Sequence, residues 1–169
     1  MNIFIPHFSQ TMCAQALDDK RLNKMIVETA QLLCTAIHEK YNTNNLAYYI
    51  AVKDSLYKAT HKHHPCTKWA ILHWANYHWL YVYWLELVGE YIHRFGKTHK
   101  TYEKLKHDLM EFDHSMVATG DKEPTPFVNC TPYKDEPNIF IAYRKCLIEK
   151  WKNDKLKPKW TKTAKPIWS

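Results

Sequence analysis

The stretch from about Cys66 to Phe95 constrains the fold more than any other part of this sequence. Its apolar and aromatic residues recur at the spacing of one helix face, over a length that no ordinary strand reaches. The stripe consists of Trp69, Leu72, Asn76, Trp79, Tyr83, Glu86, Leu87 and Glu90. Such a stripe is more often protein core than a platform for stacking bases. Asn76 must find polar partners inside it, either structural or from a ligand.

Four more helices are expected, which predicts an all-α chain. Their approximate ranges are 11–41, 46–59, 100–116 and 138–151. Only three glycines are present, too few for an all-β protein with many tight turns. Four prolines make the segment 118–137 irregular. We therefore expect a compact single domain over residues 1–169, with about five helices and an irregular basic tail at 152–169.

Several classes of protein are excluded by what the sequence lacks. No apolar run is long enough to cross a membrane. Residues 1–10 show no basic stretch followed by a long apolar core, so they do not predict a secretory signal. Five cysteines are an odd number and none form a C-x-x-C pair, which favours reduced thiols in the cytoplasm. We expect a cytoplasmic monomer.

The formal charge of +7 is concentrated near the C-terminus. The segment 144–165 holds nine basic residues against two acidic ones, while charges elsewhere cancel. A local basic excess is typical of a protein with a polyanion partner, although it also suits a solvated tail. Trp160 and Trp168 lie among the tail lysines. They can stack on bases, or they can hold the tail against the core.

Charged residues also follow a pattern on the first predicted helix. Lys20, Lys24 and Glu28 are four residues apart, so they share one stripe, and Arg21 lies beside it. A carboxylate close to cations suits a protein that holds a phosphate backbone while moving a proton. The alternative is an exposed helix face with one Lys24–Glu28 pair.

The loop "THKHHPC" places three histidines next to Cys66. Zinc sites usually take ligands from two separated segments, and no second Cys/His pair stands out. We therefore expect no metal and no cofactor. The loop could donate hydrogen bonds to DNA, or its histidines could cap the next helix. The residues predicted to contact DNA are Lys20, Arg21, Lys24, His64, Arg94, Lys97, Lys100, Arg144, Trp160 and Trp168.

Several sequence pieces, in this order, resemble those of small phage-encoded proteins of the pyrimidine dimer DNA glycosylase group. They are "DDKRLNKMIVETAQLL", "THKHHPCTKWA", "EYIHRFGKTHK" and "TPFVNC". The resemblance covers nearly the full length. It implies a metal-independent DNA glycosylase/AP lyase that acts on damaged pyrimidines in duplex DNA.

The resemblance also implies catalytic residues. The α-amine of the chain start would attack C1′ of the damaged nucleotide, and Glu28 would assist. That amine belongs to Met1, or to Asn2 if Met1 is removed. The target base would be flipped out of the stack. Two other functions remain open at this point: a non-catalytic nucleic-acid-binding phage protein, and an enzyme that acts on modified nucleotides through the histidine loop.

Overall fold

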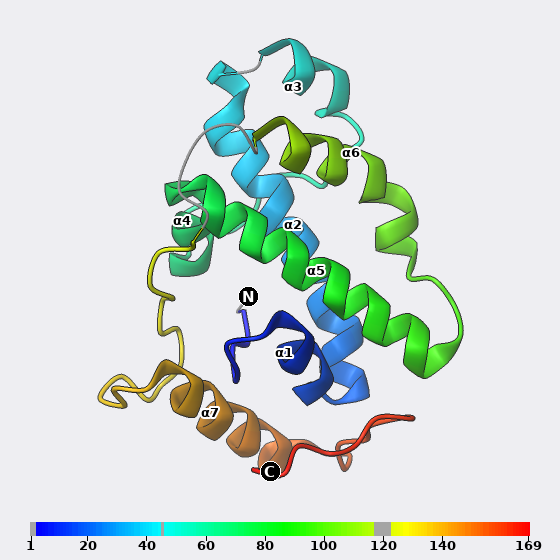
Figure 1. Cartoon of the computed structure of the whole chain (residues 1–169), viewed down its shortest axis with the longest axis vertical. Coiled ribbons are helices and arrows are strands. Elements are labelled where there is room, and N and C mark those ends of the chain that lie inside the picture. Colours follow the sequence, from blue (N-terminus) through cyan, green and yellow to red (C-terminus); the bar gives the residue numbers. More distant parts are fainter. Residues whose placement is uncertain (1–2, 45, 117–122) are drawn as a thin grey trace.

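Helices α2 and α5 cross at the centre of the fold (Figure 1). The computed structural model describes residues 3–44, 46–116 and 123–169, and all its regular elements are helices. The helices are α1 (Gln10–Ala16), α2 (Asp19–Asn44), α3 (Leu46–Val52), α4 (Pro65–Leu72), α5 (Trp74–Phe95), α6 (Lys100–Met116) and α7 (Ile139–Asn153). The all-α prediction is confirmed. None of the described helices is long and apolar enough to cross a membrane.

Two of the five predicted helices are each divided in two. Between α1 and α2, Leu17 is extended, and the Asp18 carboxylate accepts the amides of Lys20 and Arg21 at 3.1 and 3.2 Å. Between α4 and α5, His73 is extended and its Nδ1 accepts the Ala75 amide at 3.1 Å. A side chain that satisfies the free amides of a helix start favours a new start at that point. The helical spacing of apolar residues continues across both breaks, so the sequence pattern did not reveal them.

Two helix ends follow their predicted signals. Pro65 is the first residue of α4. Helix α5 ends at Gly96, whose φ of 65° is left-handed and whose amide donates to the Ile92 carbonyl. Helix α6 has the predicted bounds. Helix α3 is shorter than the predicted 46–59, because Ser55 and Leu56 turn back to the Val52 carbonyl.

The aromatic stripe of α5 is core, as its spacing predicted. Trp79, Tyr83 and Leu87 are buried. Asn76 is fully buried and has structural partners, since it donates to the Trp69 carbonyl and to the Thr125 hydroxyl and accepts the Thr125 amide. Leu72 is instead 66% exposed, because the break at His73 takes it out of register.

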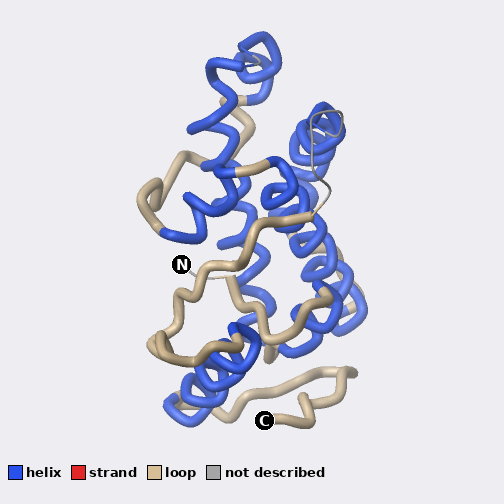
Figure 2. The backbone as a smooth tube through the Cα atoms, turned by 60° about the vertical axis from the view of Figure 1, so that its left-hand side comes forward, coloured by secondary structure: helices blue, strands red, loops and turns tan. Residues whose placement is uncertain are grey.

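The C-terminal third wraps the helices that precede it. An irregular segment descends to α7, and the tail then runs back across the end of the molecule (Figure 2). The Trp151 indole donates to Asp18 at 2.7 Å, and Trp168 stacks on Trp151 with centroids 5.6 Å apart. The Trp160 indole donates to the Ala16 carbonyl at 3.2 Å. Both tail tryptophans therefore hold the tail to the body.

Candidate active site

The beginning of the chain lies against the start of α4. Ile3 is buried, and its backbone hydrogen bonds to the sulfur of Cys66. Ile3 and Cys66 also line one cavity of only about 10 Å³, which is too small to hold a nucleotide. Met1 and Asn2, the predicted carriers of the nucleophilic amine, lie outside the described residues. The described chain thus begins next to the histidine loop.

His64 lies next to Cys66, directly before the first residue of α4. Its Nδ1 accepts the Cys66 amide at 3.2 Å and caps α4, as the capping alternative predicted. Burial lowers the pKa of the imidazole, although the Glu28 carboxylate acts in the opposite direction. The lowered pKa favours the neutral form of the ring near pH 7. The Glu28 carboxylate is therefore near enough to act on the imidazole through its charge.

Glu28 is the last residue of the stripe on α2 that begins with Lys20 and Lys24. Its side chain is 17% exposed, and its Oε1 lies 3.3 Å from the ammonium of Lys24. Lys24 and Lys20 are 67% and 72% exposed along the same stripe. Lys20 pairs with Asp154 at 3.0 Å, just after α7. The stripe therefore leads from Asp154, just after α7, to the half-buried carboxylate of Glu28.

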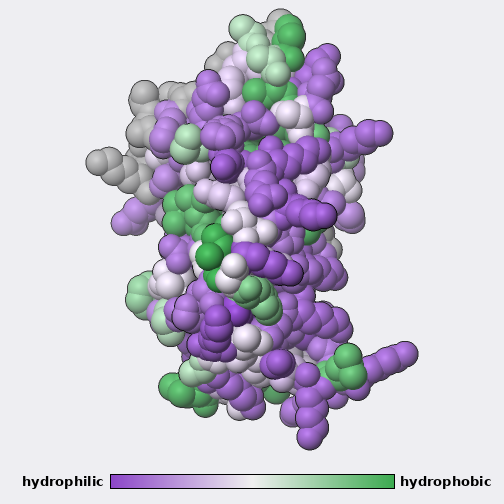
Figure 3. All heavy atoms as spheres, turned by 90° about the vertical axis from the view of Figure 1, so that its right-hand side faces the viewer, coloured by the Kyte–Doolittle hydropathy of each residue, from purple (hydrophilic) through white to green (hydrophobic). Residues whose placement is uncertain are grey.

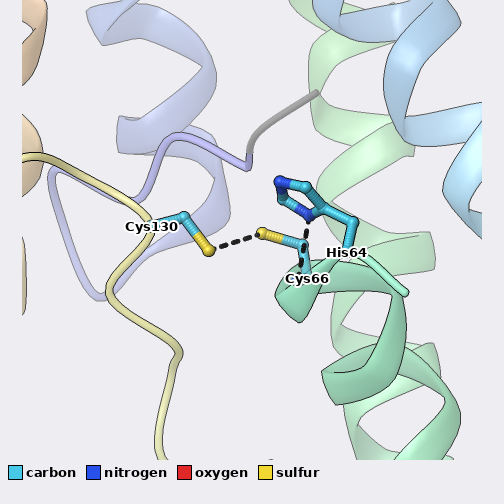
Figure 4. A group of neighbouring side chains, drawn as sticks. All are labelled: His64, Cys66 and Cys130. Atoms are coloured by element: carbon cyan, nitrogen blue, oxygen red, sulfur yellow. Dashed lines mark hydrogen bonds between the residues drawn. The ribbon is translucent and has the colours of Figure 1, made fainter. Parts of the chain in front are cut away.

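Two thiols meet beside His64. The sulfurs of Cys66 and Cys130 are 3.4 Å apart, although the residues are 64 positions apart in sequence. Figure 4 shows Cys130 pointing from the loop before α7 toward Cys66 at the start of α4. The hydrogen bond between them raises the pKa of Cys66 and lowers that of Cys130. Sequence reasoning missed Cys130, because it follows an irregular segment that no periodicity positions.

Two predicted DNA-binding arginines are inside the protein. Arg94 is 1% exposed and donates to Glu90 at 2.7 Å, to Asp19 at 3.0 Å and to two carbonyls of the α1–α2 region. Arg21 is 9% exposed and pairs with Asp18 and Asp154, both at 2.7 Å. These guanidinium groups hold helix ends together. We therefore leave both residues out of the DNA surface.

The remaining predicted contacts lie at two places. Lys97 and Lys100 are exposed around the turn between α5 and α6, on a face that is mostly hydrophilic (Figure 3). Arg144 donates to the Pro6 carbonyl at 2.9 Å and lies 5.6 Å from the centre of the Trp168 ring. Arg144 and Trp168 line a cleft of about 770 Å³ between α1 and the tail. Trp160 packs on Trp151, with ring centroids 5.1 Å apart.

A family model described as pyrimidine dimer DNA glycosylase matches residues 1–104. The match includes α1–α5 and therefore the chain start, Glu28 and His64. Cys130, α7 and the tail lie beyond it. No curated protein and no solved structure matches the chain. Membership of this family implies DNA repair and a DNA substrate. The matched region covers well over half of the chain's 169 residues, so the chain belongs to the pyrimidine dimer DNA glycosylase family.

Proposed function

We propose that this protein is a DNA glycosylase with AP-lyase activity and that the α-amine at its chain start is the nucleophile. One observation carries the proposal: the family match contains the chain start, Glu28 and His64, the Ile3 backbone contacts Cys66 at the start of α4, and the charge of Glu28 acts on the His64 imidazole. An α-amine suits this role because its ordinary pKa, about 7.7–8.0, leaves a useful fraction unprotonated at neutral pH.

The chemistry has two stages. The amine nitrogen bonds to C1′ of the damaged nucleotide, and the bond from C1′ to the base breaks; the base leaves with its electron pair and takes up a proton. The nitrogen then loses a proton, and its lone pair forms a protonated imine at C1′ as the bond from C1′ to O4′ breaks and O4′ takes up a proton. Removal of a C2′ proton expels the 3′-phosphate by β-elimination. A nearby carboxylate is needed to move these protons, and we assign this role to Glu28.

DNA would reach the site along α2. Lys20 and Lys24 are exposed, and at about 1.5 Å of rise per residue the stripe from Lys20 to Glu28 is roughly 12 Å long. Cations at this spacing can contact successive phosphates of one strand, which positions the strand without reading its sequence. Lys97, Lys100 and the tail lysines add sequence-independent affinity.

The substrate class follows from the family description. A pyrimidine dimer is distorted and poorly stacked, so turning it out of the helix costs less than turning out a normal base. The proposed DNA contacts Lys20 and Lys24 are exposed, and the cavity of about 10 Å³ at Ile3 is too small to hold a base. We therefore expect the damaged nucleotide to be recognised at the surface beside His64.

Borohydride trapping tests the proposal. Reduction of the imine should join the protein covalently to DNA that contains an abasic site or a pyrimidine dimer, and undamaged DNA should give no product. Mass spectrometry of the trapped peptide should place the adduct on the residue that begins the mature chain, Met1 or Asn2.

Other results would contradict it. Binding without any trapped product would favour a non-catalytic DNA-binding protein. An adduct on Lys24 would keep the lyase but reject the α-amine. Release of a modified base from free nucleotides would favour the third candidate, an enzyme of nucleotide metabolism.

A further inference from the structure

The structure assigns a metal site that the family description does not mention: we propose that His64, Cys66 and Cys130 bind one Zn²⁺ ion beside the chain start. Each residue offers one ligand atom, and the three atoms lie within 4.8 Å of one another. No other group of three or more possible ligands gathers in the described part of the chain. The proposal replaces our expectation from sequence that the histidine loop binds no metal.

The donor set favours zinc. Two thiolates and one imidazole are soft to borderline ligands, which bind Zn²⁺ in preference to Mg²⁺ or Ca²⁺. Tetrahedral zinc with bonds of about 2.3 Å to sulfur places two sulfurs about 3.8 Å apart. The Cys66 and Cys130 sulfurs are at 3.4 Å, so small side-chain movements would open the space for the ion. The fourth position would be taken by water or another ligand.

The two segments that supply the ligands are fixed independently of any ion. On one side, His64 and Pro65 begin α4 and set the direction of Cys66. The neutral imidazole has a single free lone pair, which accepts the Cys66 amide in this structure. Zinc would compete with that amide for the lone pair, and the rest of the α4 start would stay in place.

On the other side, hydrogen bonds fold the loop around Cys130 into one shape. The Asn129 side chain accepts the Thr131 amide and hydroxyl and donates to the Tyr133 carbonyl. The Tyr143 hydroxyl donates to the Val128 carbonyl at 3.0 Å. These contacts hold Cys130 where a metal needs it, although the loop has no regular secondary structure.

A bound ion would join parts of the chain that the sequence keeps far apart. It would link the loop before α7 to the start of α4, next to the Ile3 backbone that contacts Cys66. Because zinc binds the folded arrangement and not an unfolded chain with scattered ligands, it would also raise the melting temperature. This inference does not depend on the lyase chemistry and holds even if no adduct with DNA is trapped.

The test uses the full chain, reduced and stripped of metal, titrated with Zn²⁺ against a chromophoric chelator. We expect one zinc per chain and a higher melting temperature when zinc is bound. Loss of a partner that only orients a ligand weakens metal binding by about 10–100-fold. Cys66→Ser and Cys130→Ser remove a ligand, so each should weaken zinc binding by about 100-fold or more.

Matched controls separate ligation from folding. His64→Asn removes the imidazole but keeps a good helix cap, and should weaken zinc binding. His73→Asn makes the same change at the cap of α5 and should bind zinc like the wild type. Cys146→Ser removes a buried thiol of α7 that lies outside the cluster, and should also leave zinc binding unchanged.

A second measurement uses the unaltered chain, in case a cysteine variant fails to fold. Zinc should protect Cys66 and Cys130 from alkylation, which peptide mass spectrometry can locate. The proposal is overturned if reduced protein shows no saturable 1:1 binding, or if Cys130→Ser binds zinc as tightly as the wild type. It is also overturned if a Cys66–Cys130 disulfide forms at the same rate with and without saturating zinc.

Discussion

The start of α2 carries two sets of charges that neighbour each other in sequence and differ in exposure. Lys20 and Lys24 are exposed and lead to the half-buried Glu28. Arg21 lies one residue from Lys20 but is buried between Asp18 and Asp154. One residue is a turn of about 100° around a helix, which is enough to move a charge from solvent to the interior.

This difference in exposure separates charges that can bind DNA from charges that hold the helices together. The buried set, with Arg94 and Asp19 as its second pair, connects α2 to α5 and to the tail. The two arginines of this set, Arg21 and Arg94, form their hydrogen bonds inside the protein, so they cannot neutralise phosphates without breaking those bonds. The exposed set gains little from its own ion pairs, since exposed pairs contribute about 0–1 kcal/mol. Those lysines are available to DNA.

The largest effect should come from the buried set. Arg94→Met should lower the free energy of unfolding by about 3–5 kcal/mol, because it leaves the Glu90 and Asp19 carboxylates without their cation. Denaturant unfolding measures this change. The exposed control, Lys97→Met, should change stability by less than about 0.5 kcal/mol. A loss below about 1 kcal/mol for Arg94→Met would mean that the network is not a structural unit.

The next largest effect concerns the exposed set and the chemistry. Glu28→Gln keeps the size of the side chain and removes the charge, so lyase turnover should fall about 10²-fold or more. Stability should change by less than about 1 kcal/mol, because the Lys24 ammonium of this i,i+4 helix pair is 67% exposed and such pairs contribute about 0.3–0.5 kcal/mol. Single-turnover cleavage of abasic DNA provides the measurement.

Lys24→Ala is the matched control for Glu28→Gln. Both substitutions break the same ion pair, so any effect of the pair alone on stability is shared. Lys24→Ala should weaken DNA binding and leave single-turnover cleavage at saturating protein near the wild-type rate. Full activity in Glu28→Gln would reduce the stripe to a solvated helix face.

A smaller effect is expected from the tail. Lys155, Lys157 and Lys159 are exposed and can be changed together to Gln without removing the contacts of Trp160. Each lost phosphate contact reduces the salt slope by about 0.9, so the logarithmic slope of affinity against salt should become shallower by about 2–3. Fluorescence anisotropy with duplex DNA at several salt concentrations tests this.

Trp160→Ala supplies the contrast for the tail. It should lower stability, because Trp160 packs on Trp151 and caps the Ala16 carbonyl, and it should leave the salt slope unchanged. An unaltered slope in the triple lysine variant would show that the tail only holds the body together.

Most of the helical fold could be predicted from the sequence. Long apolar stripes indicated the helices, and Pro65 and Gly96 indicated two of their ends, because those signals act within a few residues. The breaks at Leu17 and His73 could not be predicted in the same way. Each depends on one side chain that caps a new helix while the apolar spacing continues.

The candidate site also contains residues that a local pattern predicts and residues that it does not. Glu28 was predicted because it continues the four-residue spacing of Lys20 and Lys24 on one helix. His64 was predicted because it lies in a histidine-rich loop just before Pro65. The interior position of Arg94 depends on Asp19, which is 75 residues away. Cys130 depends on a loop held by hydrogen bonds. Long-range pairing of this kind leaves no periodic trace in one sequence.

The smallest expected effect concerns Asp19, the second carboxylate of the buried network, and its response to acid. Burial raises the pKa of Asp19, but hydrogen bonds from Thr161 and Arg94 outweigh burial and hold that pKa below its ordinary value. The folded state therefore keeps the carboxylate charged to lower pH than the unfolded state does. Its contribution to stability is present above the ordinary aspartate pKa of about 3.9, and it is lost as pH falls through the lowered value.

Asp19→Asn removes this titration while keeping an oxygen that can accept from Thr161. Its free energy of unfolding should be lower than that of the wild type by roughly 1 kcal/mol at pH 7, the scale of one hydrogen bond. The two proteins should converge in stability as pH falls below about 4, because the wild-type carboxyl then becomes protonated and loses its charge. Urea unfolding at a series of pH values measures both curves. A difference that stays constant down to pH 3 would show that Asp19 acts through its shape alone, and that the charge on this side of α2 adds nothing to the assembly.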